Sequence, residues 1–211
     1  MKHIGIAKET IFKAVEKLLE NRYPSDGTKV SAGNIELWDH ILEVKNDKEL
    51  AKIFNDKLIA AGDNIETLLA NPNFYSCCAK HKIVLDNKLH RYIFNGISSH
   101  FRDLDEDSIN DLRVFFSNQN KTFLKRVIKD FKKYVEDKSY ETQELREPRV
   151  EIDLILDIFT PIFEIVFSEH SDLKNELKDS DFIESLKDVS INGISESIGT
   201  FFKLLDVNIE E

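Results

Sequence analysis

Apolar residues return at three- and four-residue spacing along most of the chain, the spacing that places them on one face of an α-helix. The first such stretch is 8–22, where Ile11, Val15 and Leu18 share a face. A turn at 24–27 follows it, and Asn34 or Ser31 is placed to cap a second helix. The predicted helices run over about 8–22, 35–42, 50–58, 74–100 as one or two in line, 109–116, 123–134, 150–167, 171–178, 181–188 and up to 205.

Residues that interrupt helices are rare. The chain has only 7 Gly and 4 Pro among 211 residues, whereas sheet-rich folds need frequent turn residues. The β-branched pair Ile83-Val84 is the one place where the 74–100 pattern is expected to break. We therefore predict an all-α protein, an orthogonal multi-helix bundle of about eight to ten helices.

The stretch 150–167 is apolar on nearly every side. It carries eleven aliphatic or Phe residues between Ile152 and Phe167, so neighbouring helices must cover it all round. We expect it to be the central core helix. The alternative is a homodimer formed through 150–167 and 191–205.

The chain divides by charge. Residues 1–133 hold 22 Lys and Arg against 19 Asp and Glu, and residues 134–211 hold 7 against 20. Residues 136–148 are polar with few apolar anchors. This pattern predicts an N-terminal helical subdomain at 1–135, an exposed connection at 136–148 and an acidic C-terminal helical subdomain at 149–211, packed with the first as one unit.

Composition restricts the cellular setting. Cys77 and Cys78 are neighbours in sequence and cannot readily bridge each other, and residues 1–9 lack the apolar region of a signal peptide. Acidic residues and Pro161 interrupt the most apolar stretch, which argues against a membrane span. We expect a cytoplasmic protein with reduced thiols, no membrane contact and no structural metal.

Three histidines, His81, His90 and His100, fall within the 74–100 pattern. His81 or His100 is the candidate axial ligand of a haem, in a helical sensor for haem or another apolar ligand. His81 and His90 are nine residues apart, which turns a helix through about half a circle, so they are not expected to share a site. No cofactor is the favoured expectation.

The acidic string 103–108 resembles the start of a calcium loop, but Ser108 stands where that loop needs Gly and Val114 where it needs Glu. Helix capping by Asp105 or Asp107 is the favoured interpretation. The repeated tetrapeptide Asn-Gly-Ile-Ser at 95–98 and 192–195 is too short to establish a repeat. Its glycines are expected at tight helix crossings or breaks.

A basic helix face is the candidate partner-binding surface. Lys125, Lys129, Lys132 and Lys133 lie opposite the apolar face of the helix at 123–134. These lysines can contact phosphates, but pairing with the acidic C-terminal third is favoured because those charges belong to the same chain.

The N-terminal region has the rhythm of a helix-turn-helix, which makes a DNA-binding regulator an alternative. However, the second helix presents Glu36, Asp39 and Glu43, and carboxylates repel DNA. The net charge of -10 also disfavours nucleic acid.

The chain contains no glycine-rich phosphate loop, no Gly-x-Ser-x-Gly and no Cys-x-x-Cys, so we do not expect an enzyme and assign no catalytic residue. The favoured function is a non-catalytic interaction or regulatory module that binds a protein partner through its acidic C-terminal surface.

Overall fold

The computed structural model describes residues 17, 21, 29–44, 48–60, 65–100, 104–145, 150–189 and 195–208, and every structural statement below refers to these residues. They form helices and connections without a strand. The helices are α2 (Ile35–Val44), α3 (Lys48–Ala60), α4 (Ile65–Leu69), α5 (Pro72–Lys80), α6 (His90–His100), α7 (Glu106–Ser117), α8 (Lys121–Leu145), α9 (Val150–Glu169), α10 (Ser180–Asp188) and α11 (Glu196–Leu204), with short 3-10 helices η2 (Asn87–Leu89) and η3 (Ser171–Leu177). The all-α prediction is confirmed.

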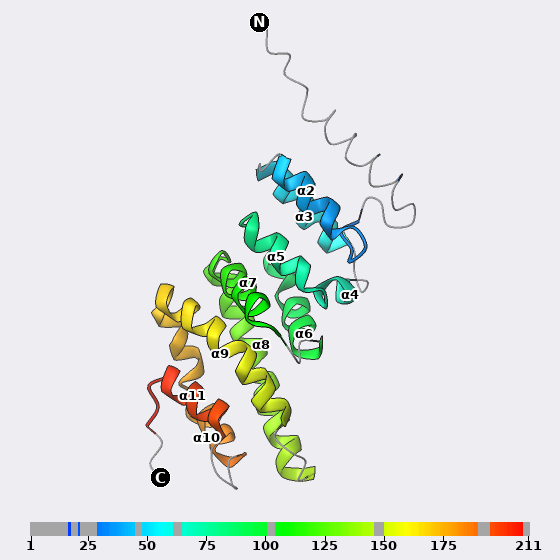
Figure 1. Ribbon diagram of the computed structural model, residues 1–211. Helices are drawn as coiled ribbons and strands as arrows, with labels where there is room; N and C mark the ends of the chain where they lie inside the picture. Colours follow the sequence, from blue (N-terminus) through cyan, green and yellow to red (C-terminus); the bar gives the residue numbers. More distant parts are fainter. Residues whose placement is uncertain are drawn as a thin grey trace, which may run out of the picture.

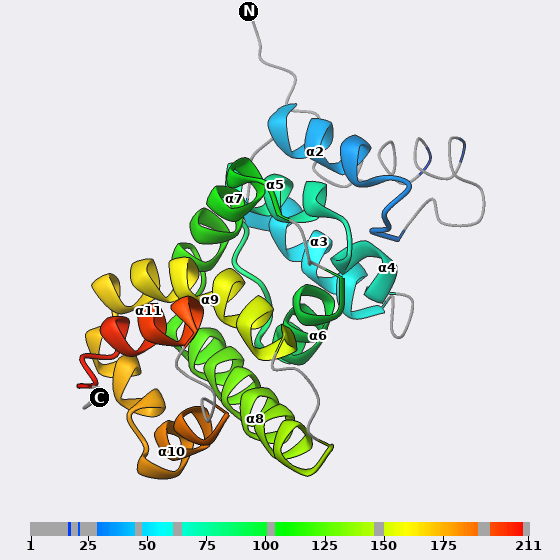
Figure 2. The same ribbon diagram turned by 60° about the horizontal axis from the view of Figure 1, so that its bottom comes forward.

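The helices cross one another in a bundle, with α2 and α3 at one end and α10 and α11 at the other (Figure 1). Helix α5 packs on α2 and α7, and α7 packs on α9. Helix α9 in turn contacts α11, η3 and α8 (Figure 2). Among the described residues, none of the helices combines the length and the apolar character needed to cross a bilayer.

Helix α9 is the predicted central helix. Phe159 packs against aromatic rings from α6, α7 and α8, and Phe163 packs against Phe131 and Phe201. Each such pair adds about 0.5–1.5 kcal/mol beyond the buried area. The apolar sides of α9 and α11 are therefore covered within the chain, which supports the core interpretation; the homodimer stays a prediction.

A second group of aromatic rings continues the core towards the N-terminal side. Each ring of this group packs against the next, in the order Trp38, Phe54, Phe74, Phe115 and Phe116. Phe116 in turn packs against Phe159. The buried apolar residues from Val30 to Leu205 thus form one cluster.

The segment expected as an exposed connection, 136–148, is helical as far as Leu145, because α8 extends through it. Val135 and Ser139 are buried, and the Ser139 hydroxyl donates to the Val135 carbonyl. Two buried positions four residues apart are enough to hold this polar stretch against the core. The subdomain boundary itself stays a prediction.

Helix α5 ends in a Schellman motif, the reason the 74–100 pattern is not one helix. Lys82 has a positive φ of 51°, its N–H donates to Ala79, and the Ile83 N–H donates to Cys78 at 2.9 Å. Residues 83–86 then have no regular secondary structure, at the position of the predicted break. The buried side chain of Gln119 fastens this stretch, accepting from Leu85 N and donating to Ile83 O.

Predicted helix caps are found at several positions. Asp105 caps α7 by accepting from the Ser108 N–H, which confirms the capping interpretation of the acidic string. Gly96 lies at a tight crossing of α6 with α4, as expected. Residues 192–194 of the second Asn-Gly-Ile-Ser lie outside the described residues, and so does the predicted helix at 8–22 apart from residues 17 and 21. The helix-turn-helix prediction therefore stays untested.

Candidate metal centre

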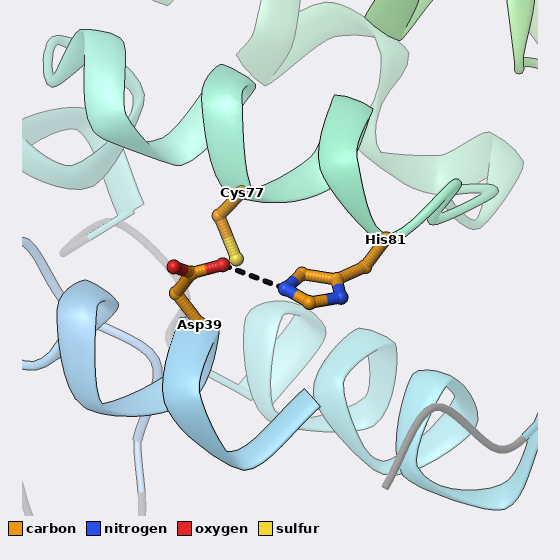
Figure 3. A group of neighbouring side chains, drawn as sticks. All are labelled: Asp39, Cys77 and His81. Atoms are coloured by element: carbon orange, nitrogen blue, oxygen red, sulfur yellow. Dashed lines mark hydrogen bonds and ion pairs between the residues drawn. The ribbon is translucent and has the colours of Figure 1, made fainter. Parts of the chain in front are cut away.

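Two helices bring three different metal-ligating side chains together. Asp39 comes from the middle of α2, Cys77 from α5, and His81 from the residue that directly follows α5. One ligand atom from each lies within 4.8 Å of the other two. Figure 3 shows the carboxylate, the thiol and the imidazole turned towards one another between the two helices.

Local structure places each of the three groups. Cys77 and His81 are four residues apart, so they project from the same side of α5, and the His81 N–H still donates to the Cys77 carbonyl at 3.1 Å. Helix α2 is positioned by the buried Asn34, whose amide donates to Lys29 O and whose Oδ1 accepts from Ser31 N.

The site is closed on one side and open on the other. Cys77 is 3% exposed and the side chain of His81 is 4% exposed, whereas 27% of the Asp39 side chain is exposed. A cavity of about 290 Å³ adjoins the cluster and is lined by Ile35, Glu36, Asp39, Asn73, Ser76, Cys77 and Lys80. Solvent therefore reaches Asp39 from the cavity, whereas Cys77 lies beside the cavity and is buried.

Hydrogen bonds hold the carboxylate in its ionised form. Asp39 Oδ1 lies 2.6 Å from His81 Nε2, and Asp39 Oδ2 lies 3.0 Å from Lys80 Nζ. Burial raises the pKa of Asp39, but the bonds from Lys80 and His81 outweigh it and leave that pKa below its ordinary value. The bond to Asp39 likewise raises the pKa of Lys80.

Cys77 is protonated at neutral pH in the absence of a metal ion. Burial, reinforced by the negative charge of Asp39, raises its pKa from 9.0 to about 12. Cysteine nucleophiles need a lowered pKa and a base free to take the thiol proton. Here the pKa moves in the opposite direction and His81 Nε2 is already engaged by Asp39, so the arrangement does not favour nucleophilic catalysis.

The formal charges around the cluster match a divalent ion. Asp39 and Glu43 each carry one negative charge, Cys77 adds a third as thiolate, and Lys80, which lies 3.7 Å from Glu43, contributes one positive charge. Lys80 and Glu43 offset each other, and the two negative charges of Asp39 and the Cys77 thiolate are those that a divalent cation neutralises; Glu36, which lines the cavity, adds a further exposed carboxylate. Lys80 binds the second carboxylate oxygen of Asp39. A hydrogen bond to that oxygen is the usual way in which a residue outside the ligand set orients a ligating carboxylate.

Of the two predicted cofactor candidates, the structure places His81 in this cluster. His100 is the last residue of α6, and its side chain lies outside what the structure describes. His90 lies elsewhere, with Nδ1 2.6 Å from Asp130 Oδ2.

The predicted lysine surface is divided between ion pairs and solvent. Lys125 pairs with Glu176 at 2.7 Å, and Lys132 with Asp179 at 3.4 Å and Glu136 at 3.7 Å. Lys129 and Lys133 are exposed and form no ion pair with the described residues. The favoured pairing of this face with the acidic C-terminal third is thus present for two of the four lysines.

Sequence reasoning did not select Asp39 or Cys77 as site residues. The available signal was the spacing Cys77-x-x-x-His81, which puts a thiol and an imidazole on one side of a helix. Asp39 is 42 residues from His81, and only the packing of α2 on α5 brings them together.

Comparison with known proteins adds no assignment, because no protein-family model, no curated protein and no solved structure matches this chain.

Proposed function

We propose that this protein binds one divalent transition-metal ion of the zinc class through Asp39, Cys77 and His81. The observation that carries the proposal is the convergence of carboxylate, thiol and imidazole on one point, with the thiol and imidazole almost fully buried. Oxygen, sulfur and nitrogen donors together suit zinc, whereas calcium and magnesium prefer oxygen alone.

The ion would have three protein ligands and one accessible position. Tetrahedral zinc sites with three protein ligands take a water or another molecule at the fourth position, and the 290 Å³ cavity beside Asp39 and Cys77 has room for it. Metal binding would replace the Asp39–His81 hydrogen bond with two metal bonds, which requires a His81 imidazole with no proton on Nε2. The bond from Cys77 separately requires the loss of the thiol proton.

Binding would join α2 to α5 and stabilise the fold. An ion that binds only the folded state contributes about 2.7 kcal/mol when its free concentration is about 100 times the Kd. The protein would therefore act as a metal-responsive helical module, in which the ion sets the position of α2.

Cobalt titration tests the proposal, because Co²⁺ reports thiolate ligation by a charge-transfer band in the near ultraviolet. We expect one Co²⁺ per chain, a thiolate band, and displacement by Zn²⁺. Cys77→Ala should remove the band, and His81→Gln should weaken binding.

Two matched variants serve as controls. Cys78→Ala removes a neighbouring buried thiol outside the cluster, and His90→Gln removes a histidine that has the same carboxylate contact without a thiol. Both should bind Co²⁺ as the unchanged protein does. A protein that binds no ion, or a thiolate band that survives in Cys77→Ala, would contradict the proposal.

A second candidate is the interaction module that binds a basic protein partner, favoured by the distribution of unpaired charge. Asp172, Glu176 and Asp179 are engaged with lysines of α8. Other acidic residues of the C-terminal third are exposed and form no ion pair with the described residues: Asp157, Glu164, Glu169, Asp181, Glu184, Asp188 and Glu196. Such a surface attracts a basic partner.

Charge-matched variants separate this surface from general acidity. Asp157→Asn with Glu164→Gln removes two unpaired charges from α9, and Asp172→Asn with Glu176→Gln removes two that are paired internally. Binding of an oligolysine peptide at low salt should fall more with the first pair than with the second. Equal losses would show that only net charge matters and would count against a specific surface.

A further inference from the structure

A larger cavity lies between α3, α4, η2 and the start of α6. Its volume is about 440 Å³, within the range of small-molecule sites. Its apolar lining includes the side chains of Leu58, Ile65 and Leu89, all at most 2% exposed. Its polar lining comes from Lys88, His90 and Arg91.

Among the described residues, the charged side chains that line this cavity are the cations Lys88 and Arg91. Lys88 and Arg91 are exposed and have no ion pair among the described residues. The Arg91 guanidinium stands 5.6 Å from the centre of the Tyr92 ring, which also lines the cavity. Lys88 and Arg91 thus place two cations without ion-pair partners among the described residues at one cavity of a chain whose net charge is -10.

The described carboxylates near the cavity form no ion pair with Lys88 or Arg91. Asp86 Oδ1 accepts from the Lys88 backbone N–H at 2.8 Å, and Asp130 Oδ2 lies 2.6 Å from His90 Nδ1. That contact directs the Asp130 charge to the imidazole and fixes the orientation of the ring. Its other nitrogen, Nε2, has no hydrogen bond to a described residue.

We propose that this cavity binds a small organic anion, a carboxylate with a short apolar chain, with the chain against Ile59 and the carboxylate at Lys88 and Arg91. The apolar wall supplies favourable burial, and an arginine can bind a carboxylate through two parallel hydrogen bonds. The proposal uses residues separate from Asp39, Cys77 and His81 and does not rest on metal binding.

Three probes of different chemistry test the two parts of the site in the full-length protein. Hexanoate has both the chain and the charge, hexanol has the chain alone, and acetate has the charge with almost no chain. Titrations followed by calorimetry and by amide chemical shifts should show binding of hexanoate at the residues of η2 and α6. Hexanol and acetate should each bind at least about tenfold more weakly than hexanoate, because hexanol lacks the charge and acetate lacks the apolar chain.

Paired variants locate the charge. Lys88→Gln with Arg91→Gln should weaken hexanoate about tenfold and leave hexanol unchanged. Lys129→Gln with Lys133→Gln, which removes two exposed lysines of α8 that do not line the cavity, should change neither. Ile59 lines the cavity and is 37% exposed, so Ile59→Asn should weaken hexanoate and hexanol alike without removing a core residue.

The proposal is overturned if hexanoate does not bind or if hexanol binds as tightly as hexanoate. It is also overturned if the Lys88/Arg91 double variant and the Lys129/Lys133 double variant weaken hexanoate binding equally. The last result would show attraction by overall charge alone. Thermal unfolding of each variant shows whether it is folded. We expect both double variants to fold, because all four substituted cations are exposed.

Discussion

Gly96 of α6 lies directly against Leu69 at the end of α4. A methyl group at Gly96 would stand 2.6 Å from Leu69 Cβ and 3.2 Å from the Leu69 carbonyl oxygen. Real side chains do not approach so closely, and the atoms met first belong to the backbone or lie next to it. The crossing of α4 and α6 therefore requires glycine at this position.

Gly96→Ala should destabilise the protein by about 1–3 kcal/mol, the usual cost of inserting a methyl group into a packed contact. Gly33→Ala is the matched control, because a methyl there would meet only Ser31 Oγ at 4.0 Å. Urea unfolding of both variants measures the difference. Equal stability of the two would show that α4 moves aside without cost.

Lys82→Gly should stabilise the protein by about 1 kcal/mol. Lys82 occupies the left-handed position of the Schellman motif that ends α5, with φ 51°, where a Cβ atom is unfavourable and glycine is preferred. Lys178→Gly is a suitable contrast, since Lys178 has φ -89° and gains nothing from glycine. Thermal unfolding should show a higher Tm for Lys82→Gly alone.

Stability should fall with rising pH between about pH 9 and 12, in part because of Cys77. Its pKa is raised from 9.0 to about 12 on folding. Below pH 9 both states hold the proton, whereas above it the unfolded state loses the proton first, so the stability contributed by the neutral buried thiol is lost as pH rises.

Cys77→Ala should reduce this alkaline slope in urea unfolding measured across the same pH range. Some slope remains, because burial also raises the pKa of Cys78 and of Tyr75. An unchanged slope in Cys77→Ala would mean that the Cys77 thiol ionises in the folded protein as easily as in water.

Metal binding should release one thiol proton per ion near neutral pH, because the Cys77 thiol is protonated without metal and zinc binds the thiolate. The metal affinity of the unchanged protein should then rise about tenfold per pH unit between pH 6 and 8. Calorimetry in buffers of different ionisation enthalpy counts the protons. Release of no proton would exclude thiolate ligation.

Gln119→Ala should destabilise the protein by about 1–3 kcal/mol, because it leaves buried backbone groups without a partner. The Gln119 side chain accepts from Leu85 N at 2.8 Å and donates to Ile83 O at 2.9 Å. Asn110→Ala, at an exposed position of α7, the helix that precedes Gln119, should have little effect. Amide hydrogen exchange at Leu85 should accelerate only in Gln119→Ala.

The helices were predictable because their cause is local. The spacing of apolar residues marks the buried face of each helix, as in Phe123, Val127 and Phe131 of α8, all at most 1% exposed. The α8 extension through 136–145 was missed, because a polar stretch with two inward positions, Val135 and Ser139, carries almost no periodic signal.

The candidate metal centre could be predicted only in part. Cys77 and His81 belong to one helix end, so their proximity was available from their spacing. The third ligand was not, because Asp39 on α2 looks like any exposed acidic residue until α2 is packed on α5. The same holds for the 440 Å³ cavity, whose walls come from four elements.

The amino-acid sequence by itself determines that this protein is helical and that α9 is its central helix. It also determines the lysine face of α8 and the acidic character of the C-terminal third. Helix periodicity and the distribution of charge depend on residues that are close in sequence, so they can be recognised without the tertiary structure. The meeting of Asp39 with Cys77 and His81, and of Lys88 and Arg91 with an apolar cavity, was decided only by tertiary packing, because contacts between distant residues depend on how whole helices cross.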